Sequence, residues 1–421
     1  MIRLKDSLTL RFPALASRDF AIFWGTFFMS LIGTAMQNTA LPILAYHLSG
    51  SRFYLGLIGA ASAFPTLLLA LPGGVLVEHM DKRRLVILLQ LVMLVQALAL
   101  AILTLTGSIR IWHILLLSLL LGTAMAVEIT ARQAMLVELV GKEALPNAIA
   151  LQSTAFNAAR VIGPSLVAPF LLFIPARGEG WVFLANAVSF LFIVIGLTFV
   201  RTPFRLTARP ERRNWIVEMR DGWSYIRGTP VVFSLIILAA LIGLLAFPIL
   251  QQFPSIAKDV LSQAGDSKAQ ADARASALYT AQGVGALIAA SYLAANSNIR
   301  RKGRMLIFGQ YAYMLGMVAL AFSRTLPLTI LIVLVMNWGA VSQLQMMNVL
   351  IQTQVPNGLR GRVFSTYLWA LQGIAPVGSL LIGGMAQAWG VPVTALACGI
   401  LCILAVSLIH LKNPAILKSE A

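Results

Sequence analysis

Long apolar runs, separated by short polar segments, dominate this sequence. Many of them reach the roughly 18–20 residues that an α-helix needs to cross the hydrocarbon core of a bilayer. They lack the period-2 alternation of membrane β-strands. Because a bilayer admits only helices or closed barrels, the pattern predicts an all-α integral membrane protein.

The runs divide into twelve predicted transmembrane helices in two six-helix halves. They cover residues 20–46, 54–77, 85–106, 111–133, 146–173, 181–200, 231–254, 273–297, 304–323, 327–353, 362–388 and 391–411. The predicted parts are a cytoplasmic arm (1–19), an N-terminal half (20–200), a cytoplasmic linker (201–229), a C-terminal half (230–412) and a cytoplasmic tail (413–421). Trp215, Trp223 and Tyr225 in the linker predict an amphipathic helix at the membrane surface.

Composition and charge place the protein in the membrane and away from nucleic acid. Only 11% of the residues are charged, although the net charge is +17, whereas soluble domains are about one quarter charged. Most of the 32 Lys and Arg residues fall in loops that become cytoplasmic when both termini are cytoplasmic, as the positive-inside rule requires. The cations therefore indicate topology and contacts with anionic lipids.

One short turn, residues 73–85, carries the most specific pattern. An apolar run ends at Gly74, three consecutive cations begin at Lys82, and a second run starts at Leu85. This is typical of a tight cytoplasmic turn between two transmembrane helices.

The turn resembles the signature loop between helices 2 and 3 of the major facilitator superfamily. The positions that match are Gly74, Glu78, Asp81, Lys82 and Arg83. Asp81 replaces the usual glycine, as in the branch of macrolide efflux pumps and enterobactin-type siderophore exporters, and His79 replaces the usual cation. Residues 354–363 and 147–164 resemble the helix-11 entry and the helix-5 pattern of the same branch.

An internal repeat supports two related halves. The loop Arg300-Arg301-Lys302-Gly303-Arg304 repeats the character of Asp81-Lys82-Arg83-Arg84, and a glutamine follows six residues later in both, at Gln90 and Gln310. Two such halves are the organisation of major facilitator transporters. The resemblance implies a conformational latch in which Glu78 caps helix 11 near Arg360 and Arg362; the alternative is a solvated loop acid.

Glu128 is the one carboxylate that the sequence places well inside a predicted span. Ionisable groups at such positions are costly and usually functional. Arg132 lies one turn further on the same helix face, and Arg160 is a second embedded cation. Glu128 is therefore predicted to accept a proton or contact the substrate, with both arginines controlling its charge. The alternative is a static ion pair between helices 4 and 5.

Gly163-Pro164 resembles the core of the antiporter motif of helix 5, but Val167-Ala168 replace its usual glycines. The pair predicts a kink in that helix.

Amides inside the predicted spans are candidates for the wall of a substrate cavity, although amides also bond between helices. They are Gln37, Asn38, Gln282, Asn337, Gln345 and Gln372.

We expect a secondary transporter of a bacterial inner membrane, monomeric, with both termini cytoplasmic. The resemblance implies proton-coupled efflux, by alternating access, of a moderately large lipophilic organic compound or drug. A specific siderophore or lipid-like metabolite exporter is the alternative within transport, and a non-transporting membrane receptor is the alternative outside it. The sequence contains no catalytic cluster, phosphate loop or metal-ligand spacing, so we expect no enzyme, cofactor or metal.

Overall fold

The computed structural model describes residues 12–174, 177–202, 223–296 and 301–417, with the side chains of residues 70–79, 142, 357 and 358 left out. Within these ranges the regular structure is helical and contains no strand. Twelve helical segments of this part are long and apolar enough to cross a membrane. The predicted all-α, twelve-span fold is therefore confirmed.

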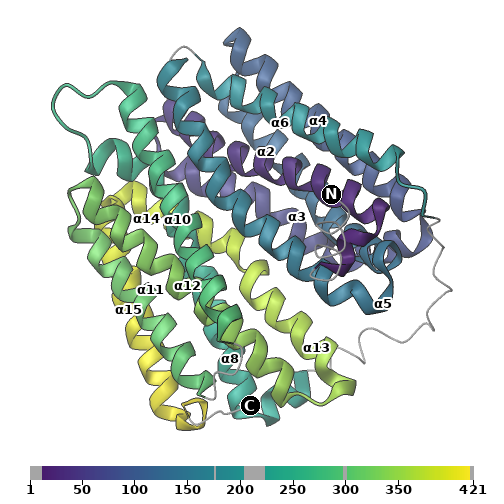
Figure 1. Cartoon of the computed structure of the whole chain (residues 1–421). Helices are drawn as coiled ribbons and strands as arrows, with labels where there is room; N and C mark the ends of the chain where they lie inside the picture. The colour runs from purple at the N-terminus through teal and green to yellow at the C-terminus, as the bar shows by residue number, and fades with distance from the viewer. Residues whose placement is uncertain (1–11, 175–176, 203–222, 297–300, 418–421) are drawn as a thin grey trace. The chain divides into compact units, whose positions relative to one another are not determined.

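The chain forms two compact units (Figure 1). The first contains Met1–Leu48 and Phe64–Pro210, and the second contains Ser49–Ala63 and Glu211–Ala421. The first residues of α3 (Arg52–His79) therefore group with the second unit. The sequence, in contrast, predicts a division of the chain at the 201–229 linker. Residues 203–222 of that linker, with Trp215, lie outside the described residues.

The first unit consists of a short 3-10 turn and long apolar helices. They are η1 (Pro13–Ala16), α2 (Arg18–Ser49), the later part of α3 (Arg52–His79), α4 (Lys82–Thr106), α5 (Ile111–Phe173) and α6 (Gly178–Thr198). Helix α4 packs against both α5 and α6. The predicted span ends agree with these bounds to within a few residues, with one exception in α5.

The exception is the connection between predicted spans 4 and 5, which is helical. Helix α5 continues through the predicted loop and breaks only at Gly141, whose φ is 71° and ψ 172°. Residues with positive φ are nearly always glycine because other side chains clash there. Span 4 therefore extends to Gly141, beyond its predicted end at residue 133.

The second unit contains the remaining helices, shown in teal to yellow in Figure 1. They are α8 (Pro230–Leu241), η2 (Ile242–Ala246), η3 (Phe247–Gln252), α9 (Phe253–Ser255), η4 (Ile256–Val260), α10 (Lys268–Ala295), α11 (Lys302–Phe322), α12 (Leu326–Gln354), α13 (Asn357–Leu368), η5 (Trp369–Gly373), α14 (Ala375–Trp389), α15 (Val391–Lys412) and η6 (Pro414–Ile416).

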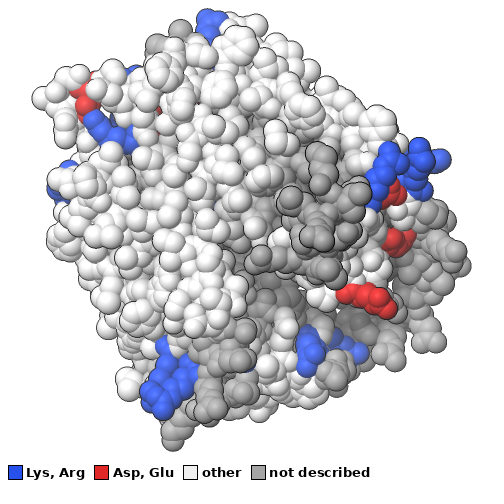
Figure 2. All heavy atoms as spheres, viewed as in Figure 1, with Lys and Arg blue, Asp and Glu red and all other residues white. Residues whose placement is uncertain are grey.

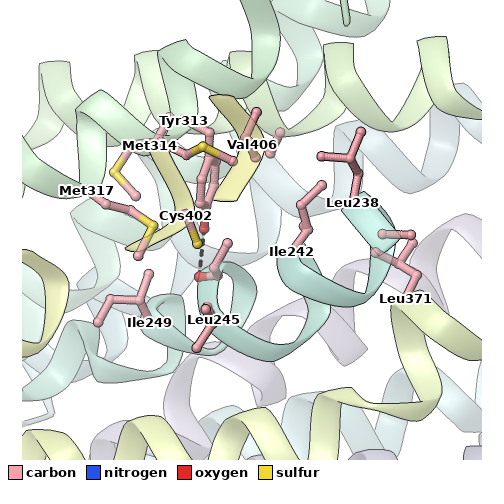
Figure 3. Packing of buried hydrophobic residues seen from close by; sticks show 14 of the residues in the cluster. Leu238, Ile242, Leu245, Ile249, Tyr313, Met314, Met317, Leu371, Cys402 and Val406 are labelled. Carbon is pink, nitrogen blue, oxygen red and sulfur yellow. Dashed lines mark hydrogen bonds between the residues drawn. The ribbon is translucent and has the colours of Figure 1, made fainter. Parts of the chain in front are cut away.

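Span 7 of the second unit is irregular along most of its length. After α8 it passes through a π segment at η2, a 3-10 segment at η3 and a second π segment at η4. Such departures free backbone carbonyls that need other partners in an apolar interior. The Ala246 carbonyl accepts a hydrogen bond of 2.9 Å from the hydroxyl of Tyr313 on α11, drawn dashed in Figure 3. Tyr313 therefore stabilises the break in span 7.

Replacing Tyr313 with phenylalanine should cost about 1–3 kcal/mol, because the buried Ala246 carbonyl would lose its side-chain partner. Tyr313 is fully buried and packs among Leu245, Met314 and Met317 (Figure 3), so water has no access to replace it. The measurement is denaturant or thermal unfolding of the purified protein. Tyr292→Phe is the matched control because Tyr292 is 46% exposed. Equal stability of Tyr313→Phe and the parent protein would contradict this role.

Candidate functional site

Glu128 lies deep in the first arm of α5. Because this arm ends at Gly141, about 20 Å of helix separates Glu128 from its end at 1.5 Å per residue. The sequence places the end of span 4 much closer to Glu128. The Glu128 side chain is only 6% exposed. A buried carboxylate therefore lies near the middle of a helix that is long and apolar enough to cross a membrane.

Two side chains approach the Glu128 carboxylate. Arg132 Nε lies 3.1 Å from Oε1 and 3.4 Å from Oε2, one helical turn away as its spacing predicts. Gln90 of α4 donates from Nε2 to Oε1 at 3.4 Å. The predicted Glu128–Arg132 pair is thus present in the structure, and Gln90, noticed in the sequence only as part of a repeat, belongs to it.

The Arg132 guanidinium also packs 4.5 Å from the centre of the Phe27 ring of α2. A cation over an aromatic face is attracted by the ring quadrupole. Glu128, Arg132, Gln90 and Phe27 therefore join three helices of the first unit, and we name these four residues the Glu128 cluster. The side-chain amide oxygen of Gln90, Oε1, is buried without a hydrogen-bond partner.

The structure places Arg160 apart from the Glu128 cluster. Its guanidinium lies 5.8 Å from the centre of the Phe156 ring, one turn earlier on the same helix. Among the described residues, no ion pair joins Arg160 to Glu128. Of the two predicted arginine partners, only Arg132 contacts the carboxylate.

The cations of the signature turn bind within the first unit. Asp81 caps α4 by accepting a hydrogen bond of 2.8 Å from the Arg84 backbone nitrogen. Lys82 is buried and forms an ion pair with the half-buried Glu138 of α5. Arg83 donates to the Thr198 carbonyl at the end of α6, at 2.9 Å, where cations are favoured by the helix dipole. These contacts hold the ends of α4, α5 and α6 together.

The structure does not test the contact predicted between the other residues of the latch. Gly74 and Glu78 belong to the helical part of α3, but their side chains lie outside the described residues. Arg360 is exposed and Arg362 is half-buried in α13. The latch stays a prediction.

Two carboxylates important to the first unit escaped sequence reasoning. Glu138 lies beyond the predicted end of span 4 at residue 133, because the apolar run fades before it, although the helix continues to Gly141. Glu179, in the first turn of α6, is 3% exposed and pairs with Nδ1 of His47 at 2.9 Å. His47 lies near the end of a predicted span, and nothing in the sequence indicates that it has a buried acidic partner.

Gly163 permits close packing between α5 and α2. A Cβ at this position would lie 2.5 Å from the Ala35 Cβ, well inside van der Waals contact. Pro164 remains inside the helix, and the non-helical break of α5 is at Gly141. Gly163 therefore marks a helix–helix contact, and the kink at the Gly-Pro pair stays a prediction.

The amides predicted to line a cavity occupy different environments. Gln37 is fully buried and bonds Gln96 of α4 and Asn186 of α6, at 3.2 and 2.8 Å. Asn337 is buried and donates to the Val333 carbonyl of its own helix. Asn38, Gln345 and Gln372 are exposed and Gln282 is half-buried, so these four remain candidates for substrate contact.

Comparison with known proteins finds similar proteins over most of the chain. The family model described as "Transmembrane secretion effector" matches residues 9–420. The multidrug efflux pump Tap of Mycolicibacterium fortuitum is 23% identical over 377 residues, which is 87% of this chain and 88% of Tap. The enterobactin exporter EntS of Salmonella choleraesuis (strain SC-B67) is 23% identical over 362 residues, covering 85% of this chain and 83% of EntS.

Solved structures share the fold at lower identity. A bacterial homologue of the human lysosomal transporter Spinster matches with a TM-score of 0.72 and 14% identity, over 96% of this chain and 98% of the homologue. A POT family transporter in complex with 5-aminolevulinic acid matches with a TM-score of 0.73 and 11% identity, over 95% and 97% of the two chains.

Proposed function

The chain belongs to the transmembrane secretion effector family of the major facilitator superfamily, and from this premise we propose that it exports a moderately large lipophilic organic compound in exchange for protons. Family and relatives are transporters and not enzymes. The observation that carries the proton coupling is the Glu128 cluster: a buried carboxylate with one cationic partner, inside a membrane span.

The cluster is suited to couple a proton to a conformational change. When Glu128 is ionised, it attracts Arg132 in a medium that screens charge poorly. Protonation removes that attraction and leaves the guanidinium with the Phe27 ring. Because the cluster joins α2, α4 and α5, its charge state biases how these helices pack. A proton can shift a two-state equilibrium only through such a difference in interaction.

The proposed substrate class follows from the small number of charged residues inside the spans and from the similar proteins. Few described charges lie inside the spans, which favours an apolar solute over a strongly charged one. The drug pump Tap supports a broad lipophilic range. The EntS match supports the second candidate, a specific siderophore or lipid-like metabolite exporter.

The remaining elements of the proposal concern the setting of transport. We place the protein in a bacterial inner membrane as a monomer, with both termini cytoplasmic and anionic lipids at its surface, as the positive-inside rule favours. Alternating access would proceed by rocking of the two halves around a midplane site. Gly74, Glu78, Arg360 and Arg362 would form the latch of that motion.

Glu128→Gln should abolish proton-driven export while leaving the protein folded. Glutamine keeps the size and the hydrogen-bonding capacity of the side chain but cannot ionise. The measurement uses proteoliposomes with an imposed pH gradient and a fluorescent lipophilic drug. In the variant, accumulation of the drug against its own concentration gradient should fall at least about tenfold, to the level of passive leak. A tenfold fall corresponds to roughly 1.4 kcal/mol of lost driving energy.

Glu143→Gln is the matched control, because Glu143 is an exposed acid further along α5. It should transport like the parent protein. If Glu128→Gln still expels the drug against its gradient with unchanged pH dependence, Glu128 is not the coupling group. A parent protein that exports none of a panel of drugs but exports a siderophore selects the second candidate.

A further inference from the structure

One end of the second unit carries cations without internal partners. Arg301 and Arg304 at the start of α11, and Lys412 at the end of α15, are exposed, and Lys302 is half-buried. Within the described residues none of these four forms a salt bridge. Their charge is therefore available to a ligand.

The repeat-related cations of the first unit behave differently. There Lys82 is buried against Glu138, and Arg83 donates to the Thr198 carbonyl. The two loops have similar sequences, but Lys82 and Arg83 each have a partner, whereas Arg301, Lys302 and Arg304 form no salt bridge among the described residues. A role in holding the ends of neighbouring helices together therefore accounts for the first cluster and not for the second.

No carboxylate competes for these cations within the helices that surround them. The sequences of α8, α11, α12, α13 and α15 contain neither Asp nor Glu. At the lower left of Figure 2, where the green and yellow helices of Figure 1 end, blue atoms are visible without red ones. The α11 N-terminus, which lacks a side-chain cap, adds positive potential of the same sign.

An exposed apolar stripe runs from the cations along each helix. On α11, Arg304 is followed on the same face by Phe308 and Leu315, which are 63% and 56% exposed. On α15, Leu404 and Leu408 precede Lys412 at helical spacing and are 62% and 54% exposed. A ligand with a negative head and long apolar chains matches this arrangement.

The C-terminal turn keeps the two cationic helix ends together. Ile416 of η6 is fully buried, and its carbonyl lies so close to Gly303 that a Cβ there would come within 1.8 Å. The buried hydrogen bond of 2.8 Å between His410 Nε2 and Gln310 Oε1 joins α15 to α11 near the same helix ends, two residues before Lys412 and six residues after Arg304. The cations of both helices therefore belong to one site.

We propose that this site binds an anionic phospholipid, with the headgroup phosphate on Arg301, Arg304 and Lys412 and the acyl chains along α11 and α15. The assignment rests on the proposed membrane setting, in which this end faces the cytoplasmic leaflet. Juxtamembrane cations attract anionic headgroups in that leaflet. The lipid then stabilises the second unit at its cytoplasmic end.

The test measures lipid binding directly and does not require transport. The parent protein and Arg301→Gln/Arg304→Gln, both in neutral detergent, are titrated with phosphatidylglycerol or phosphatidylcholine of identical chains, and bound lipid is counted by native mass spectrometry. The parent should prefer phosphatidylglycerol. The double variant should lose about fivefold in affinity for phosphatidylglycerol per cation removed, hence roughly 20- to 30-fold in total. It should therefore no longer prefer phosphatidylglycerol to phosphatidylcholine.

Arg84→Gln/Arg201→Gln removes the same charge from exposed positions of the first unit and should bind phosphatidylglycerol like the parent. The proposal is overturned if the parent binds both lipids equally, if the Arg301/Arg304 variant keeps its preference, or if the control loses as much affinity. Glycerol phosphate should compete poorly, since it lacks the acyl chains; strong competition would replace the lipid with a soluble phosphate. Failure of lipid binding would leave the export assay of Glu128→Gln unaffected.

Discussion

Arg132→Met should destabilise the protein by about 3–5 kcal/mol, because it leaves the Glu128 carboxylate in a membrane span without its cation. The carboxylate keeps only the 3.4 Å contact from Gln90. Methionine preserves most of the apolar stem of the arginine side chain, so lost volume contributes little, although the guanidinium contact with Phe27 is also removed. Unfolding of the purified protein and the yield of folded protein in membranes are the measurements.

A second substitution separates the effect of charge from that of packing. Glu128→Gln/Arg132→Met removes both charges, and it should recover most of the stability lost in Arg132→Met. The exposed Arg84 provides the control: Arg84→Met should change stability by less than about 0.5 kcal/mol. If the double variant is as unstable as Arg132→Met, the loss comes from packing and the ion pair is not its cause.

Gly243→Ala should weaken the second unit by roughly 2–3 kcal/mol, since nothing but a hydrogen fits between η2 and η5. A Cβ at Gly243 would lie 2.1 Å from the Leu371 carbonyl oxygen. That atom belongs to a backbone and cannot rotate away. The two irregular segments of spans 7 and 11 would have to separate, with a loss of buried contacts on both sides.

Gly384→Ala is the matched control, with an opposite expected sign. Gly384 lies in α14 and a Cβ there would meet nothing within 4 Å. Alanine in a helix is favoured over glycine by about 0.5–1 kcal/mol, so this variant should equal or exceed the parent in stability. Similar thermal midpoints for Gly243→Ala and Gly384→Ala would show that the close contact between η2 and η5 is not required.

Hydropathy was sufficient to predict the helices but not all of their ends. Apolar length identifies a span because the bilayer sets it, and all twelve predicted spans correspond to helices. The α5 arm that reaches Gly141 was shortened because Arg132 and Glu138 lower the hydropathy there. In the structure both side chains have partners, which offset the cost of placing charge in a helix of the bundle interior.

The sequence by itself determined the membrane class, the twelve spans and the Glu128–Arg132 pair, because each depends on neighbours along one helix. Only the tertiary structure decided that Gln90 and Phe27 complete that cluster and that Lys82 binds Glu138. It also decided that Arg301 and Arg304 form no salt bridge within the described part of the chain. These facts depend on which helix faces touch. Periodicity shows that a face is apolar, whereas its partner is chosen by packing between residues far apart in the chain.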